Sequence, residues 1–335
     1  MKKRYLLAGV SGIIAGAVAT KLLTRPADVS WPDSLNFIYH PEYSWFTSVD
    51  GVRIHYQEAG DEKASPLILI HGFISSTLIW SEVFLPLAHA GFRVIAPDLP
   101  GYGYSEKPRE AEYTIESQAR AVLGLMDRLE IKKATLVGAS YGAAVAAAIA
   151  LDCPERVDKL ILIGAVTNDE PKKKLLLRIS RLPLIGDIVT PLFLGSRWVL
   201  RKRMAQMYRR IETQIDEHMI AARHHLLATA NTHRAMIKTA RRWSANRIER
   251  EASLIQQPTL LVWGEQDTHI PVSEAYRLRD AIPDARLIVF RRCGHLPPTE
   301  YPEKFVEAIA GFCKAEESEE QKPRTLEFKR GPTQK

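Results

Sequence analysis

Gly138-Ala139-Ser140-Tyr141-Gly142 is the most informative stretch of this 335-residue chain. It has the form Gly-x-Ser-x-Gly, with the apolar run 134–138 before it and the alanine-rich segment 143–152 after it. A strand, a sharp turn and a helix in this order are typical of a nucleophile elbow, which exposes a serine hydroxyl. Side chains at the two glycines would collide in so tight a turn. The helix start directs backbone N–H groups at a developing anion, which favours nucleophilic chemistry.

Four further apolar runs each end in a polar or glycine-rich loop. They are 66–70 before His71-Gly72-Phe73, 92–97 before Asp98, 259–263 before Glu265 and Asp267, and 286–290 before Gly294-His295. Alternating strand and helix signals predict a mostly parallel sheet. Serine, aspartate and histidine therefore follow predicted strands in the chain order that α/β-hydrolases use, which is not the order of chymotrypsin or subtilisin.

On these motifs the chain resembles the α/β-hydrolase superfamily over roughly residues 46–313, in its lid-bearing serine esterase and lipase-like branch, similar to monoacylglycerol lipase. The resemblance implies a mostly parallel central sheet flanked by helices, with a helical lid inserted after the sixth strand. It also implies that Ser140 is the nucleophile, His295 the general base and acid, and Asp267 the carboxylate that orients His295.

The resemblance further implies an oxyanion hole formed by the backbone N–H groups of Phe73 and Tyr141, with Gly72, Gly138 and Gly142 shaping the two loops. A serine hydroxyl is a poor nucleophile until a neighbouring base takes its proton, and imidazole titrates near neutrality. Two N–H donors then hold the tetrahedral oxyanion, and losing one typically costs about 3–4 kcal/mol.

Several residues offer alternative interpretations. Glu265 and Asp169 also follow predicted strands and compete for the role of the acid. His71 is more typical of a structural residue in the oxyanion loop than of a proton carrier. His224 and His225 lack the carboxylate or cysteine spacing of a metal site. Neither a metal nor an organic cofactor is implied by the sequence.

Serine at the nucleophile position argues against haloalkane dehalogenases and epoxide hydrolases of this fold, which carry aspartate there. We therefore expect a carboxylic ester hydrolase that works through an acyl-enzyme, acting on small-molecule or lipid esters such as acylglycerols. Two alternatives stay open: a carbon–carbon bond hydrolase of diketo acids, and a non-catalytic scaffold with a hydrolase fold.

The predicted lid, residues 168–250, carries the positive charge of the chain. It holds 18 Lys and Arg against 7 Asp and Glu, a net +11, whereas the whole chain is +7 and the remainder therefore −4. Basic helices with interleaved apolar residues suit an anionic membrane surface, and the alternative is a solvated helix face. No nucleic-acid-binding module is visible, so nucleic acid is not an expected partner.

The N-terminus strengthens the membrane interpretation. Basic residues 2–4 precede the uncharged run 5–20, which predicts a membrane anchor within residues 1–25, followed by a linker over 26–43. The Ala17-Val18-Ala19 sequence favours a cleavable signal peptide as the alternative. The charges flanking the run indicate an N-inside orientation, with the catalytic domain outside the cytoplasm.

The remaining boundaries follow from composition. Residues 44–167 and 251–314 are expected to form the hydrolase core, and residues 315–335, charged and proline-containing, a disordered tail. Asp50-Gly51 predicts a hairpin turn near the start of the core, and apolar residues at helical spacing predict a helix over 114–129. Three cysteines, an odd number without metal spacing, do not indicate a disulfide framework.

Overall fold

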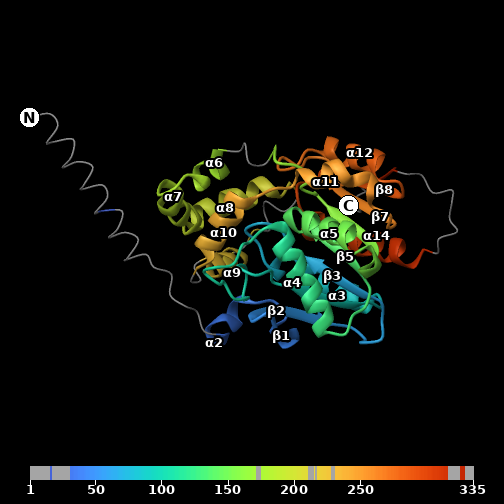
Figure 1. The fold of residues 1–335 in the computed structure, drawn as a ribbon, viewed down its shortest axis with the longest axis horizontal. Coiled ribbons are helices and arrows are strands. Elements are labelled where there is room, and N and C mark those ends of the chain that lie inside the picture. The colour runs from blue at the N-terminus through green and yellow to red at the C-terminus, as the bar shows by residue number, and fades with distance from the viewer. Residues whose placement is uncertain are drawn as a thin grey trace, which may run out of the picture.

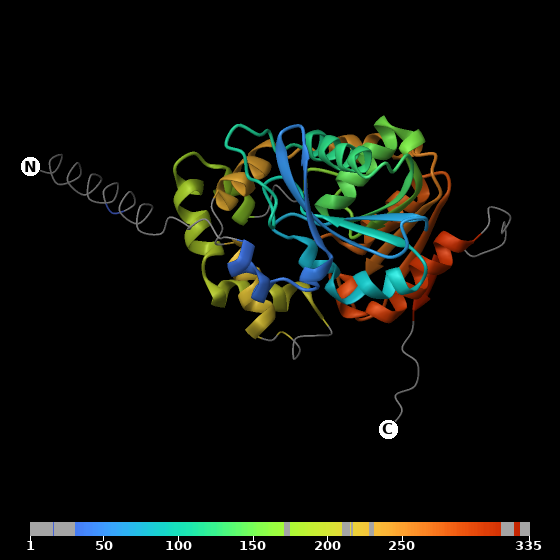
Figure 2. The same ribbon diagram turned by 90° about the horizontal axis from the view of Figure 1, so that it is seen from below.

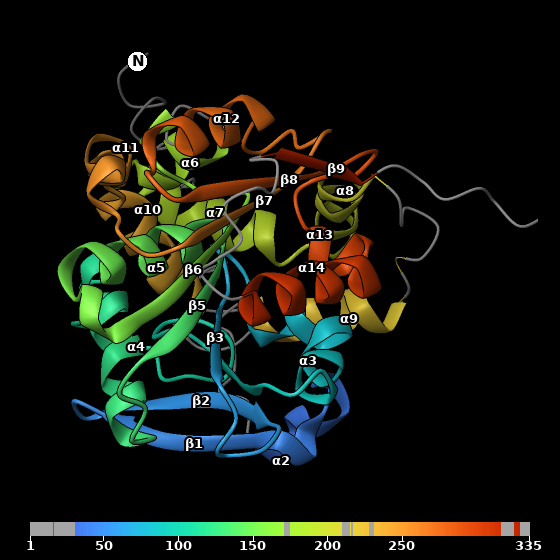
Figure 3. The ribbon, with the colours of Figure 1, turned by 90° about the vertical axis from the view of Figure 1, so that its right-hand side faces the viewer.

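The computed structural model of the protein describes residue 16 and residues 31–170, 175–209, 215, 217–227, 231–315 and 325–328. Within these residues nine strands form one sheet, in the order β1-β2-β4-β3-β5-β6-β7-β8-β9. Helices cover both faces of the sheet, as Figures 1 and 3 show. This confirms the predicted mostly parallel α/β-hydrolase sheet flanked by helices.

The strands differ in direction and burial. β1 (Ser44–Val49) and β2 (Val52–Ala59) form an antiparallel hairpin, and β2 also runs antiparallel to β4. The hairpin turns at Asp50 and Gly51, both with positive φ, as the sequence predicts. All later pairings are parallel, through β3 (Pro66–Ile70), β4 (Arg93–Pro97), β5 (Ala134–Ala139), β6 (Val157–Ile163), β7 (Thr259–Gly264) and β8 (Ala285–Phe290). These strands are near-continuous apolar runs because helices bury them from both sides.

Two groups of helices make the two apolar cores. On one face lie α4 (Ile115–Arg128), α5 (Tyr141–Asp152), α11 (Asn246–Glu251) and α12 (Val272–Ala281), and on the other lie α3 (Ser81–His89), α13 (Pro297–Glu300) and α14 (Pro302–Lys314). The predicted helix over 114–129 is α4. Its N-cap is Thr114, whose hydroxyl accepts the N–H of Ser117 at 3.1 Å. Small residues let α5 pack closely, and residues 141–150 of that helix are all buried.

Helices follow β6, as the sequence predicts for a lid. They are α6 (Leu175–Arg181), α7 (Ile185–Leu194), α8 (Arg197–Met207), α9 (Glu217–Leu227) and α10 (Thr232–Arg242), and they gather at one end of the molecule (Figures 1 and 2). A hydrogen bond of 2.8 Å from the Tyr102 hydroxyl to Thr239 Oγ1 ties α10 to the core. The short helix α2 (Trp31–Ser34) precedes β1 and lies near α9 in both views.

The C-terminal segment differs from the predicted disordered tail. Thr325–Phe328 forms β9, which pairs in parallel with β8 from Leu287 to Phe290. The sequence Thr-Leu-Glu-Phe alternates polar and apolar residues, and the N–H and C=O groups along the edge of β8 need partners. Residues 325–328 therefore form a strand against β8, although the composition of the segment 315–335 is typical of a disordered chain.

The structure does not support the predicted transmembrane anchor, nor the localisation drawn from it. Among the described residues no helix has both the length and the apolar character that crossing a bilayer requires. Apart from Gly16, residues 1–30, which include the alternative signal peptide, lie outside the described residues.

The membrane interpretation of the basic lid is also not supported, and several of its arginines form ion pairs within the fold. Arg241 contacts Asp187 at 3.2 Å, and Arg247 contacts Asp152 of the core at 2.6 Å. Arg201 of α8 pairs with Glu217 of α9. These arginines hold lid elements to one another and to the core.

Buried β6 offers a stability test. Leu162 is fully buried, and Leu162→Ala leaves a cavity between the sheet and its helices. We expect the free energy of unfolding to fall by about 2–5 kcal/mol, measured by urea denaturation. The matched variant Leu254→Ala removes the same atoms from a residue that is 61% exposed and should change stability by less than about 0.5 kcal/mol. Equal losses in the two variants would contradict the assigned core.

Candidate active site

The elbow stands at the carboxyl end of β5, where Ser140 adopts φ 54° and ψ −113°. A positive φ is strained for serine, and such strain is common at functional sites. The Ser140 N–H donates to the Ile163 carbonyl at 2.8 Å, and its carbonyl accepts the Val166 N–H at 3.2 Å. These bonds hold the elbow against the end of β6, while α5 begins at Tyr141.

His295 and Asp267 form a buried pair in the loops after β8 and β7. His295 Nδ1 lies 2.6 Å from Asp267 Oδ2, and Asp267 Oδ1 accepts the N–H groups of His269 at 2.7 Å and Ile270 at 3.0 Å. Burial opposes ionisation of Asp267, but His295 and the two N–H groups outweigh it and lower the pKa of the carboxyl. The ionised carboxylate keeps the proton on Nδ1, so Nε2 is left as the basic nitrogen.

Gly164 joins the elbow to this pair. A Cβ added at Gly164 would lie 3.0 Å from His295 Cε1 and 3.3 Å from Asp267 Oδ2. Gly164 directly follows Ile163, the residue that accepts the Ser140 N–H. The structure thus brings Ser140, Asp267 and His295 to one end of the sheet, around the turn after β6.

Phe73 lies in the loop after β3, and Tyr141 lies in the elbow itself, directly after Ser140. A Cβ added at Gly72 would lie 3.1 Å from Ser140 Cβ, so the loop after β3 approaches the serine directly. Tyr141 is the first residue of α5, where backbone N–H groups have no partner within the helix. In the described part of the chain, no hydrogen bond uses the N–H of Phe73 or of Tyr141. Both donors are available to an oxyanion at this position.

A buried carboxylate that the sequence analysis missed supports the oxyanion loop. Asp98 accepts the N–H groups of Thr77 at 2.7 Å and Tyr104 at 2.9 Å, and its Oδ2 lies 2.7 Å from His55 Nδ1. Burial opposes its ionisation, but the hydrogen bond and charge of His55 lead the interactions that hold its pKa at about 2. The signal in the sequence is an acid between a buried strand and a glycine-rich turn.

His71 has the structural role that the sequence indicates. Its Nδ1 lies 2.8 Å from the Gly72 carbonyl, and its Nε2 accepts the Leu99 N–H at 3.0 Å. Burial lowers the pKa of His71, which outweighs the opposite effect of Asp98. The ring is therefore neutral and links the loops after β3 and β4.

Glu300, a second carboxylate missed in the sequence, anchors the His295 loop. Its Oε1 accepts the Gly294 N–H at 2.7 Å and its Oε2 accepts the Arg209 N–H at 2.8 Å. The His295 N–H donates to the Met207 carbonyl at 2.9 Å. The end of α8 is thereby tied to the loop that carries His295.

The alternatives to Asp267 as the acid, and the lid histidine His224, lie away from His295. Asp169 accepts the Ala245 N–H at 2.9 Å and lies 3.2 Å from Asn246, where it joins the two ends of the lid. Glu265 accepts the N–H of Arg292 on the exposed side of its loop. His224 of α9 lies with its Nε2 2.9 Å from the Gly195 carbonyl oxygen. Within the described residues no cluster of three metal-ligating side chains occurs.

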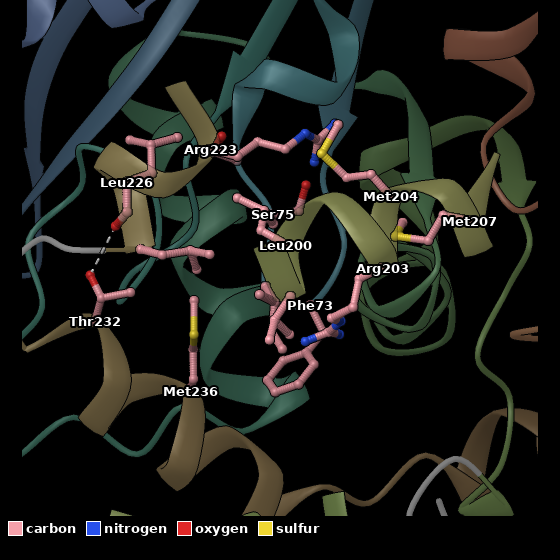
Figure 4. Close-up of a pocket in the computed structure, with 15 residues that line it drawn as sticks. Phe73, Ser75, Leu200, Arg203, Met204, Met207, Arg223, Leu226, Thr232 and Met236 are labelled. Atoms are coloured by element: carbon pink, nitrogen blue, oxygen red, sulfur yellow. Dashed lines mark hydrogen bonds between the residues drawn. The ribbon is translucent and has the colours of Figure 1, made fainter. Parts of the chain in front are cut away.

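A pocket opens beside the oxyanion loop, between it and the lid (Figure 4). Residues 73–76 of the loop and Gly103 line one side, and residues of α8, α9 and α10 line the rest. Most of the lining is apolar, from Leu200, Met204, Met207, Leu226, Leu227 and Met236, and Arg203 and Arg223 are its charged members. Because Phe73 and Met207 both border it, the pocket adjoins the oxyanion donor and the His295 loop.

Comparisons with known proteins agree with this geometry. The family model of the alpha/beta hydrolase fold matches residues 65–300. The chain is 30% identical to the 2-hydroxymuconate semialdehyde hydrolase of Pseudomonas sp. strain CF600, over 78% of this chain and 90% of that protein. A crystal structure of a meta-cleavage product hydrolase from Pseudomonas fluorescens IP01 has a TM-score of 0.69 and 26% identity, covering 81% of this chain and 98% of that one.

A further crystal structure resembles more of the chain. It is that of a membrane phospholipase A described as a bacterial virulence factor, with a TM-score of 0.68 and 26% identity. The match covers 93% of this chain and 98% of that one.

Close packing at the elbow predicts that a methyl group added there destabilises the fold, whereas one added at an open glycine does not. A Cβ at Gly142 would lie 2.2 Å from the Ile70 carbonyl oxygen, whereas one at Gly311 in α14 meets nothing within 4 Å. We expect Gly142→Ala to lower the free energy of unfolding by about 1–3 kcal/mol. Gly311→Ala should raise it by up to about 1 kcal/mol. Urea denaturation measures both, and a neutral Gly142→Ala would contradict the close approach of α5 to β3.

Asp98 predicts a pH-dependent contribution to stability. A folded pKa of about 2 against an ordinary 3.8 stabilises the fold by about 2 kcal/mol above pH 3.8, and this is lost as the pH falls through 2. We expect Asp98→Asn to lower the free energy of unfolding at pH 6. At pH 3 this loss relative to the wild type should be about 1 kcal/mol smaller. Exposed Asp61→Asn is the control and should give a small, flat difference in urea unfolding. If the loss of stability in Asp98→Asn did not change with pH, the lowered pKa of Asp98 would be contradicted.

Proposed function

The chain belongs to the α/β hydrolase family, and we propose that it breaks a bond to a substrate carbonyl carbon with Ser140 as its nucleophile. The observation that carries this proposal is the buried His295–Asp267 pair, 2.6 Å apart, held by Gly164 against the elbow of Ser140. An imidazole that is oriented by an ionised carboxylate is the base that serine requires.

The proposed reaction runs through an acyl-enzyme. His295 Nε2 takes the hydroxyl proton as Ser140 Oγ attacks the carbonyl, and the backbone N–H groups of Phe73 and Tyr141 hold the resulting oxyanion. The tetrahedral intermediate collapses, the leaving group takes the bonding pair, and the His295 imidazolium returns the proton to it. His295 then deprotonates a water molecule, which releases the acyl group as a carboxylic acid and restores Ser140.

We favour a carbon–carbon bond as the bond that breaks, in a diketo acid whose conjugated keto-acid fragment accepts the electron pair on departure. Two of the similar proteins, the 2-hydroxymuconate semialdehyde hydrolase and the meta-cleavage product hydrolase, belong to this class of hydrolases. The identity of 30% over 78% of the chain supports carrying their reaction over to this chain. The cationic residues of the pocket are consistent with an acidic substrate.

A carboxylic ester, in particular a glycerophospholipid, is the second candidate. The similarity to the membrane phospholipase A, which extends over 93% of this chain, favours it. The largely apolar pocket lining from Leu and Met side chains suits an acyl chain. The same acyl-enzyme serves both reactions, with an alcohol in place of a carbon leaving group.

Ser140→Ala provides the first test of the proposed function. The variant should lose covalent labelling by a fluorophosphonate, and kcat should fall by about 10⁴-fold or more on any substrate that the wild type turns over. Ser48→Ala, at an exposed position of β1, should label and react like the wild type. A folded wild-type protein that is not labelled would contradict the serine mechanism.

The choice between the two bonds is tested by substrate comparison. We expect the wild type to hydrolyse 2-hydroxy-6-oxo-6-phenylhexa-2,4-dienoate with a higher kcat/KM than dispersed phosphatidylcholine or p-nitrophenyl butyrate. Loss of dienoate absorbance and release of the acid products measure the rates. A preference for the phospholipid would replace the first candidate by the second, since labelling of Ser140 is common to both.

A further inference from the structure

Residues 31–40 form a strap that precedes β1 and is fixed to the core at both of its ends. Trp31 packs edge-on against Phe46 of β1, with ring centroids 5.0 Å apart. At the other end, the Gln57 side-chain amide of β2 donates to the His40 carbonyl at 3.1 Å. The part of the strap between these two anchors is therefore held at a set position on the core.

Two histidines of lid helix α9 contact the middle of the strap. His225 stacks on Phe37, with ring centroids 4.3 Å apart and ring planes 18° from parallel. Its Nε2 also lies 3.2 Å from Ser34 Oγ. His218 Nε2 lies 3.2 Å from the Asn36 carbonyl oxygen, which can only accept a hydrogen bond, so this nitrogen is the donor. The strap thus contacts α9 at two points that lie about two helical turns apart.

The opposite side of α9 lines the substrate pocket. His218 and His225 are seven residues apart in the sequence and therefore lie on one face of the helix. The pocket-lining residues Arg223, Leu226 and Leu227 lie roughly 80–180° around the helix from His218, at about 100° per residue. Figure 4 shows Arg223 and Leu226 among the side chains that surround the pocket. Helix α9 therefore lies between the strap and the pocket.

Other polar contacts of α9 join it to the lid itself. Glu217 pairs with Arg201 of α8, and Arg223 Nη2 donates to the Tyr208 hydroxyl just after α8 at 2.8 Å. Contacts of this kind move with the lid and do not fix α9 relative to the core. The strap can fix it, because its own ends are anchored on β1 and β2. The strap also lies before residues 65–300, which the family model matches.

We infer that the strap sets the position of α9, and with it one wall of the substrate pocket, so that Phe37 and His225 are positioning residues for substrate binding. This inference rests on the proposed hydrolase function and adds the element that fixes the pocket. Ser140 and His295 lie on loops of the core, so a shift of α9 should alter substrate binding and leave the chemical step unchanged.

Phe37→Ala tests the strap, because it removes the ring on which His225 stacks. The substrate is whichever of 2-hydroxy-6-oxo-6-phenylhexa-2,4-dienoate and p-nitrophenyl butyrate the wild type hydrolyses faster. We expect KM to rise about 3- to 10-fold, the effect of losing one aromatic contact, with kcat within about twofold of the wild type. Phe37→Tyr keeps the ring and should restore KM. Labelling of Ser140 by a fluorophosphonate establishes that each variant is folded.

Hydrogen–deuterium exchange measures the position of α9 without any substrate. In Phe37→Ala the amides of residues 217–227 should exchange faster than in the wild type, whereas those of α4 should not change. Leu35→Ala is the matched control, because Leu35 belongs to the strap but its side chain is 43% exposed. This variant should keep both the KM and the exchange of the wild type.

A double-mutant cycle asks whether the strap acts through the stack on His225. If Phe37 and His225 act through one contact, the double variant Phe37→Ala/His225→Ala should raise KM no further than either single variant. Fully additive increases in KM, expressed as free energies, would overturn the assignment to this pair.

The outcomes separate this inference from the function on which it rests. If Ser140 is labelled but Phe37→Ala leaves KM and the exchange of α9 unchanged, the strap has no positioning role and the serine hydrolase stands. Faster exchange with an unchanged KM would overturn the role of the strap in substrate binding. If Ser140 is not labelled and neither substrate reacts in the folded wild type, the proposed function fails, and the exchange of α9 alone decides whether the strap positions it.

Discussion

The carboxyl ends of adjacent parallel strands meet at one edge of the sheet, and every other feature of the site depends on this constraint. The loops after β3, β5, β7 and β8 carry Phe73, Ser140, Asp267 and His295, respectively. Because parallel strands lie about 4.8 Å apart, loops that are distant in the sequence meet at that edge. The lid follows β6, between the strands that present the serine and the aspartate, so it covers the same edge.

Buried carboxylates hold these loops in place. Asp98 accepts N–H groups from the loops after β3 and β4, and Glu300 accepts N–H groups from the His295 loop and from the residues just after α8. Each replaces the water that a buried loop backbone would otherwise need as a partner. The N–H donors of Phe73 and Tyr141 can then be aimed at one point before a substrate arrives, which is the requirement for electrostatic stabilisation of an oxyanion.

The lid shows why net charge is a poor guide to partners. Its excess of 11 positive charges suggested an anionic surface outside the protein. In the fold, Arg247 reaches across to Asp152 of the core and Arg241 to Asp187, while Arg203 and Arg223 face the pocket. A count of charges contains no information on which side of a helix each side chain lies or which carboxylate it meets, and both depend on packing between helices.

Local sequence was enough to predict the alternation of strands and helices, the elbow at Ser140, the hairpin at Asp50-Gly51 and the order of the polar loops, because turn chemistry and apolar periodicity are local properties of the chain. The tertiary structure was needed to see that Asp267, and not Asp169 or Glu265, contacts His295. It alone revealed the roles of Asp98 and Glu300, the strand Thr325–Phe328 and the arginines of the pocket. Each of these depends on a partner supplied by an element far away in the chain, and such pairings are fixed by packing in three dimensions and not by local sequence.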